Sequence, residues 1–135
     1  MEQLDVVELL RAVQTLERNA SVALMYSGLR MPQFRLLATL EQMGQATVTE
    51  MSARLHVTRA TASVMVNELI RTGIVAVLEN PTDRRSFHIR LTENGTNKLH
   101  VARSDLAVLQ EKLSQRLSPQ AIAALNEFTA LLVTK

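Results

Sequence analysis

The sequence contains no cysteine and no tryptophan, and aromatic residues make up only 3% of it. Without cysteine, the chain has no disulfide, no thiolate metal site, no redox-sensing thiol and no cysteine nucleophile. With so few aromatic side chains, Leu, Ala, Val and Met must fill the core, which favours helices. Glycine is also scarce, with 4 residues, and none of them belongs to a glycine-rich loop that could hold a phosphate.

Long apolar runs and a strong net charge are absent as well. No segment approaches the roughly 18 uncharged apolar residues of a membrane span. The acidic start, residues 1–5, lacks the basic region of a signal peptide. We therefore expect a cytoplasmic protein without membrane contact. The net charge of +2 is too small to indicate a nucleic-acid partner by itself, and the 135 residues fit one domain.

The apolar periodicity predicts a mostly helical chain with one small two-stranded β-hairpin. Strands are expected at 74–78 and 86–91. Helices are expected at 4–27, from the turn containing Pro32 to about Gly44, after Thr47, at 59–72, from Thr92 to about Leu117, and from Pro119 onward.

Capping residues mark the boundaries of the two central helices. Thr47 and Glu50 match a capping box, in which each side chain bonds the backbone N–H of the other residue. Thr58 is placed to cap the helix at 59–72, and Gly73 to end it. A short helix, a tight turn at His56, a second helix and a hairpin together predict a winged helix–turn–helix.

In such a fold the second helix enters the major groove of DNA, with its N-terminal residues nearest the bases. Most side chains off the core stripe of the helix at 59–72 are small or polar, which lets the helix lie close to base edges. Arg59 can pair with guanine, and Val64 is an apolar partner for a thymine methyl. For Asn67 and Arg71, an ordinary solvated face explains the sequence equally well. The predicted DNA contacts on this helix are Arg59, Ala60, Thr61, Ser63, Val64, Asn67 and Arg71.

The predicted hairpin tip carries Asp83, Arg84 and Arg85 between its two apolar strands. This charged segment is a poor core element, but it suits a narrow and negatively charged groove. Its place directly after a helix–turn–helix predicts a role in DNA binding.

In this order and spacing, the motifs resemble those of the MarR family of transcription factors. The resemblance covers essentially the whole chain and rests on Pro32–Leu37, Leu69–Val75, Asp83–Arg85 and Leu91–Gly95. It implies a homodimer in which residues 1–28 and 96–135 form dimerisation helices and residues 31–95 form the DNA-binding lobe. A long leucine stripe from Leu99 to Leu117 fits dimerisation, although packing within the chain would also explain it.

The resemblance further implies roles for the tip. Arg85 would enter the minor groove, Asp83 would orient it, and Arg84 would contact the backbone. Family members often carry a basic pair where this chain has Val77 and Leu78, so this wing has less positive charge than usual.

By the same resemblance, the dimer would be a repressor on pseudo-palindromic double-stranded DNA, released by a small aromatic effector. Arg11, Met25, Tyr26 and His100 are the candidate ligand-binding residues, and for Met25 core packing is the preferred interpretation. Two alternatives are a winged-helix module that binds protein and a metal-responsive regulator that uses His100. We expect no enzyme activity, no cofactor and no resident metal, because the three histidines are scattered.

Overall fold

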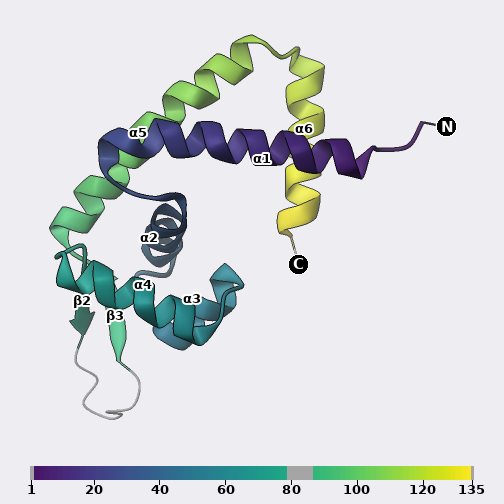
Figure 1. Cartoon of the computed structure of the whole chain (residues 1–135). Coiled ribbons are helices and arrows are strands. Elements are labelled where there is room, and N and C mark those ends of the chain that lie inside the picture. Colours follow the sequence, from purple (N-terminus) through teal and green to yellow (C-terminus); the bar gives the residue numbers. More distant parts are fainter. Residues whose placement is uncertain (1, 79–86, 135) are drawn as a thin grey trace.

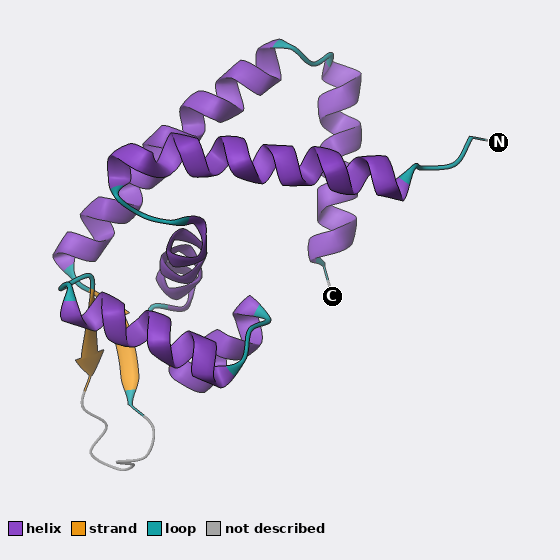
Figure 2. Cartoon of the chain, viewed as in Figure 1, coloured by secondary structure: helices purple, strands orange, loops and turns teal. Residues whose placement is uncertain are grey.

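The protein is described here by a computed structural model that covers residues 2–78 and 87–134. It is mostly helical with a small antiparallel sheet, which confirms the predicted fold class (Figure 2). The elements, labelled in Figure 1, are α1 (Val6–Ala23), the 3₁₀ helix η1 (Leu24–Ser27), α2 (Met31–Met43), β1 (Ala46–Thr47), α3 (Val48–Leu55), α4 (Arg59–Arg71), β2 (Val75–Leu78), β3 (His88–Leu91), α5 (Glu93–Gln115) and α6 (Pro119–Val133).

The first helix is shorter than predicted, because α1 gives way to η1 at Leu24. The Ser27 hydroxyl donates to the Leu24 carbonyl at 2.6 Å and accepts from the backbone N–H of Leu29 at 3.1 Å. A serine that bonds its own preceding turn competes with the helical hydrogen bonds. Periodicity alone could not distinguish this tighter turn from a continuing α-helix.

The helix–turn–helix forms as predicted from its capping residues. Thr47 and Glu50 make both bonds of the capping box, at 3.0 and 3.1 Å. His56 adopts a left-handed conformation at the end of α3, with φ of 56°. Thr58 then accepts the backbone N–H of Thr61 at 3.1 Å and begins α4.

The predicted hairpin is confirmed by the antiparallel pairing of β2 with β3, but its second strand also pairs with β1, which was not predicted. The described residues form a three-stranded sheet in the order β1-β3-β2. Ala46 lies opposite Ile89 across the added pair, and Val75 lies opposite Leu91 across the hairpin. A strand of two residues is too short to show an alternating pattern in the sequence.

The core lies where α2, α3, α4, the sheet and the first half of α5 meet. Its fully buried side chains include Leu36 and Leu40 of α2, Val66 of α4, Ile89 of β3 and Leu99 of α5. Beyond this core, α5 runs away from the sheet and carries α6 at its far end (Figure 1). Within the described ranges, no helix is long and apolar enough to span a membrane.

The leucine stripe of α5 is therefore only partly used inside one subunit. Leu99 and Ala102 are buried, whereas Leu113 and Leu117 near the far end are 38% and 37% exposed. None of the 15 residues of α6 is buried.

Candidate nucleic-acid interface

One face of α4 packs on the core and the other faces solvent. Ala62, Val66 and Leu69 are buried, which leaves the opposite face of α4 free. Of the predicted DNA contacts on this helix, Ser63 is half-buried, and the exposed ones are Arg59, Ala60, Thr61, Val64, Asn67 and Arg71. The structure thus brings these side chains onto one solvent-facing helix.

The N-terminal end of α4 presents hydrogen-bond donors to solvent. The Thr58 hydroxyl caps the helix and also donates to the Thr61 hydroxyl oxygen at 2.9 Å. The proton of the Thr61 hydroxyl can then be donated to an outside acceptor, such as a phosphate oxygen. Arg59 lies in the same exposed turn, so a cation and a hydroxyl donor are close together where the helix dipole also favours an anion.

The charge on α4 suits a negatively charged partner. Glu68 is the acidic residue of this helix, and its carboxylate lies 3.8 Å from the Arg30 guanidinium at the start of α2. This pair is partly exposed and contributes little stability. It nevertheless offsets the negative charge that would otherwise oppose a phosphate backbone.

The preceding helix α3 is fixed at its N-terminus by the Thr47–Glu50 capping box. The Thr47 backbone N–H donates to the Glu50 carboxylate at 3.0 Å, and this bond, followed by the Thr47 side-chain bond, lowers the pKa of Glu50. The carboxylate stays ionised at neutral pH, so the start of the helix–turn–helix is held in place.

The predicted wing tip, Asp83, Arg84 and Arg85, lies outside the described residues, so its roles stay predictions. The strands on either side of it are in register, with Leu78 opposite His88. In β2, Val77 is 46% exposed and Leu78 is half-buried.

The four candidate ligand-binding residues do not converge on one cavity. Tyr26, 92% exposed, lines a cavity of about 310 Å³ between α1 and α5. Arg11 instead lies 3.8 Å from Glu8 on α1, and His100 is exposed on α5. The core-packing interpretation of Met25 is wrong for the single subunit, because its side chain is 72% exposed in η1.

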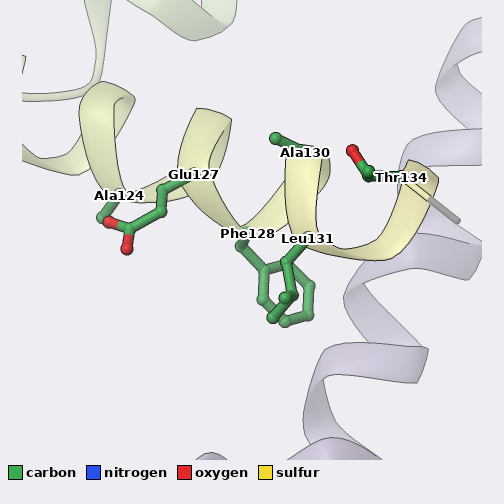
Figure 3. A pocket seen from close by; sticks show the side chains of 6 residues that line it. All are labelled: Ala124, Glu127, Phe128, Ala130, Leu131 and Thr134. Atoms are coloured by element: carbon green, nitrogen blue, oxygen red, sulfur yellow. The ribbon is translucent and has the colours of Figure 1, made fainter.

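Sequence reasoning missed two cavities, because their lining residues come together only in the fold. One, of about 510 Å³, lies where α2, the end of α3 and α5 meet, and it is lined by Arg35, Arg54, His56 and Arg103 among others. The other, of about 570 Å³, lies along α6, where Phe128 and Leu131 project to the same side (Figure 3). Among the residues that the structure describes, no group of His, Asp and Glu side chains is arranged to hold a metal ion.

Comparison with known proteins finds a family match for the central part of the chain. The MarR family model matches residues 29–87. The uncharacterised protein Rv2011c of Mycobacterium tuberculosis is 28% identical over 112 residues, 83% of this chain and 78% of its own. The uncharacterised HTH-type transcriptional regulator YvnA of Bacillus subtilis is 28% identical over 79 residues, 58% of this chain and 45% of its own.

Solved structures share the fold. Apo MarR from E. coli has a TM-score of 0.82 and 21% identity, covering 98% of this chain and 99% of its own. A MarR mutant complexed with operator DNA has a TM-score of 0.78 with the same identity and coverage. YusO from Bacillus subtilis has a TM-score of 0.73 and 22% identity, covering 95% and 92%. The MarR family model thus matches the helix–turn–helix region of this chain, and the fold of the solved MarR structures is shared along nearly its whole length.

Proposed function

We propose that this protein binds double-stranded DNA through α4 and represses transcription. The observation that carries this proposal is the exposed face of α4, which combines Arg59, Thr61 and Asn67 with the apolar Val64. Val64 is 67% exposed, so the described part of the subunit leaves this apolar side chain largely uncovered. A thymine methyl in the major groove is a suitable partner for it. The operator-bound MarR neighbour shares this fold.

We further propose that the protein acts as a homodimer formed by the terminal helices. Apolar side chains are exposed along α1 and α6, on elements distant from the recognition helix. On α6, Phe128 and Leu131 share one side, and Leu131 is 73% exposed (Figure 3). A surface of this kind favours association with a second apolar surface. The exposed residues are Val6, Val7, Leu10, Val13 and Leu16 of α1 and Leu125, Leu131, Leu132 and Val133 of α6.

A symmetric dimer would place its two recognition helices in successive major grooves of a pseudo-palindrome, about one helical turn apart. Arg85 would enter the adjacent minor groove, with Asp83 orienting it and Arg84 on the backbone. Because Val77 and Leu78 supply no charge, Arg85 would carry much of the electrostatic contact of the wing. Binding of such an operator would block RNA polymerase.

Release would follow from a small-molecule effector that binds better to a dimer with the wrong spacing than to the DNA-bound form. The cavity beside Tyr26 is the site that best supports this step. It lies between α1 and α5, and it combines the apolar Val22 and Val108 with the polar Asn19 and Lys112. A ligand there would alter how the two helices pack.

Selection of bound fragments from genomic DNA by the purified protein tests the function and yields the operator. On that operator, Arg59→Ala should weaken binding by about 1–3 kcal/mol per half-site, measured by fluorescence anisotropy. Arg85→Ala should weaken it as well, with little change in thermal stability. Arg116→Ala is the matched control, because Arg116 lies at the far end of α5.

The salt dependence of affinity provides a second criterion. A protein that contacts several phosphates shows a steep linear fall of log K with log salt concentration. A flat plot, or the same affinity for Arg59→Ala, Arg85→Ala and the control, would argue against DNA binding through this face.

A further inference from the structure

The C-terminal end of α4 is closed by backbone hydrogen bonds that carry the chain into the sheet. The Gly73 N–H donates to the Ile70 carbonyl at 3.1 Å, and the Ile74 N–H donates to the Leu69 carbonyl at 2.9 Å. This pair of bonds is a Schellman motif, and Gly73 adopts the left-handed conformation that it needs, with φ of +79°. The carbonyls of Gly73 and Ile74 come next along the chain, beyond the end of the helix.

Thr92, the residue that begins α5, binds both of these carbonyls. Its backbone N–H donates to the Ile74 carbonyl at 3.1 Å. Its hydroxyl donates to the Gly73 carbonyl at 2.7 Å, with the Ile74 carbonyl also within reach at 3.1 Å. The same hydroxyl oxygen accepts the Gly95 N–H at 3.0 Å and so caps α5. One side chain therefore ties the end of α4 to the start of α5.

Gly95 lets the two backbones approach closely. It is buried in the first turn of α5, and a Cβ atom at this position would collide with the carbonyl oxygen of Ile74 and lie 3.3 Å from its Cγ2 atom. A backbone atom cannot move aside as a flexible side chain can. Only glycine allows the first turn of α5 to rest directly on the peptide that leaves α4.

We propose that Thr92 and Gly95 are positioning residues that fix the angle between the recognition helix and α5, and thereby determine which half-site spacing the dimer accepts. This inference rests on the proposed function. The core already holds α5 near the lobe through Leu99 and Ala102, but nonpolar contacts have little directionality. The hydrogen bonds of Thr92 and the close contact at Gly95 are directional, and they fix the angle between α4 and α5.

The length of α5 makes this angle important. Its 23 residues extend about 35 Å. We call the contact of Thr92 and Gly95 with Gly73 and Ile74 the joint between α4 and α5. A rotation of about 10° at this joint displaces the far end of α5 by about 6 Å. One base pair of DNA is about 3.4 Å long. An added base pair also rotates one half-site by about 34° relative to the other. A loose joint would therefore tolerate an altered spacing better than a rigid joint would.

A series of operators with one base pair added or removed between the half-sites tests the proposal. Wild-type protein should lose at least about tenfold in affinity at the altered spacings. In Thr92→Val, which keeps the shape but loses the hydroxyl, this penalty should shrink to about threefold or less. Thr92→Ser keeps the hydroxyl and should retain the wild-type penalty. Thr96→Val, the same change at an exposed position one turn along, is the matched control.

The spacing preference separates a positioning role from a merely stabilising one. Loss of affinity by Thr92→Val that is equal at every spacing would overturn the proposal, because a weakened cap alone predicts that result. A wild-type protein that accepts all spacings equally would overturn it too. Circular dichroism verifies that each variant is folded. Gly95→Ala serves as a second variant, and it should also lose discrimination between operators of different half-site spacing.

A distance measurement without DNA tests whether Thr92 fixes the angle between α4 and α5, independently of the proposed function. Because the chain has no cysteine, Asn67→Cys on α4 and Gln110→Cys on α5 allow spin labels at two exposed positions. Pulsed electron paramagnetic resonance, on labelled protein diluted with unlabelled protein, should give one narrow distance that broadens in Thr92→Val. An unchanged distance distribution in Thr92→Val would overturn the positioning role of Thr92. Failure of wild-type protein to bind any duplex would overturn only the proposed function.

Discussion

Glu50 shows how one side chain contributes to the helix–turn–helix and how its role depends on pH. Bonds from Thr47 lower the pKa of this carboxyl below that of an unfolded chain. Its ionised form therefore stabilises the fold at neutral pH, and this contribution is lost as the pH falls through the lowered folded-state pKa. Because Glu50 is exposed, solvent weakens the effect to about a few tenths of a kcal/mol.

Glu50→Gln should accordingly be slightly less stable than wild type at pH 7, and the difference should vanish at an acidic pH well below the ordinary carboxyl pKa, where the lowered pKa of Glu50 has been passed. Urea unfolding at both pH values measures it. Glu111→Gln, near the C-terminal end of α5, is the control for the chemical change itself. A Glu50→Gln difference that stays constant with pH would contradict this role of the carboxylate.

Individual residues were predictable where local chemistry decides their role. The caps at Thr47 and Thr58 are confirmed, since each hydroxyl accepts a backbone N–H three residues ahead. Met25 was not predictable in this way. Its exposure depends on how η1 meets the rest of the molecule, and an apolar side chain by itself does not indicate which side of the helix will be covered.

At the scale of elements, the ends of α3 and α4 use the same left-handed conformation with different residues. Gly73 adopts it without strain, whereas His56 adopts it with a φ of 56°. A side chain in this region costs about 1–2 kcal/mol, because its Cβ atom crowds the backbone. Gly73→Ala should therefore destabilise the protein by about 1 kcal/mol.

His56→Gly should act in the opposite direction. The strain is removed, but the flexible unfolded chain offsets part of the gain, so we expect about 0.5 kcal/mol of stabilisation. Urea denaturation of the two variants measures both values. The same sign for both substitutions would be inconsistent with strain at His56.

The longer elements and those with clear capping residues could be predicted from the sequence, whereas the shortest could not. The helix–turn–helix and both long strands of the sheet follow from periodicity and turn residues. The short strand β1 does not, because its pairing of Ala46 with Ile89 joins segments far apart in the sequence. The contact between α4 and α5 could not be predicted for the same reason. Thr92 was recognisable as the start of a helix, but not as the hydrogen-bond partner of Gly73 and Ile74.

At the scale of the whole molecule, the unequal burial of the helices is the main observation. The lobe around Leu36, Leu40 and Val66 is well packed, whereas α6 buries none of its residues within the subunit. The sequence alone could not reveal this division, because the leucine stripe of α5 continues without a break from its buried half to its exposed half. The wing tip, with Arg85, lies outside the described residues and stays a prediction.

Dimerisation through α6 can be tested by placing a charge on its apolar side. Leu131→Glu should weaken the dimer more than tenfold, because burial of a leucine contributes about 1.5–3 kcal/mol and a buried, unpaired carboxylate costs more. Sedimentation equilibrium over a range of protein concentrations measures the change. DNA affinity should fall with it, since a monomer contacts only one half-site.

Val64→Glu provides the matched control for this experiment. Val64 and Leu131 are exposed to a similar extent, 67% and 73%, but Val64 lies on the recognition helix. The substitution should leave the dimer intact and abolish DNA binding, because a carboxylate would face the phosphates. If Leu131→Glu remained fully dimeric, α6 would not form the interface. If both variants dissociated alike, the two surfaces would not have the separate roles that we assign to them.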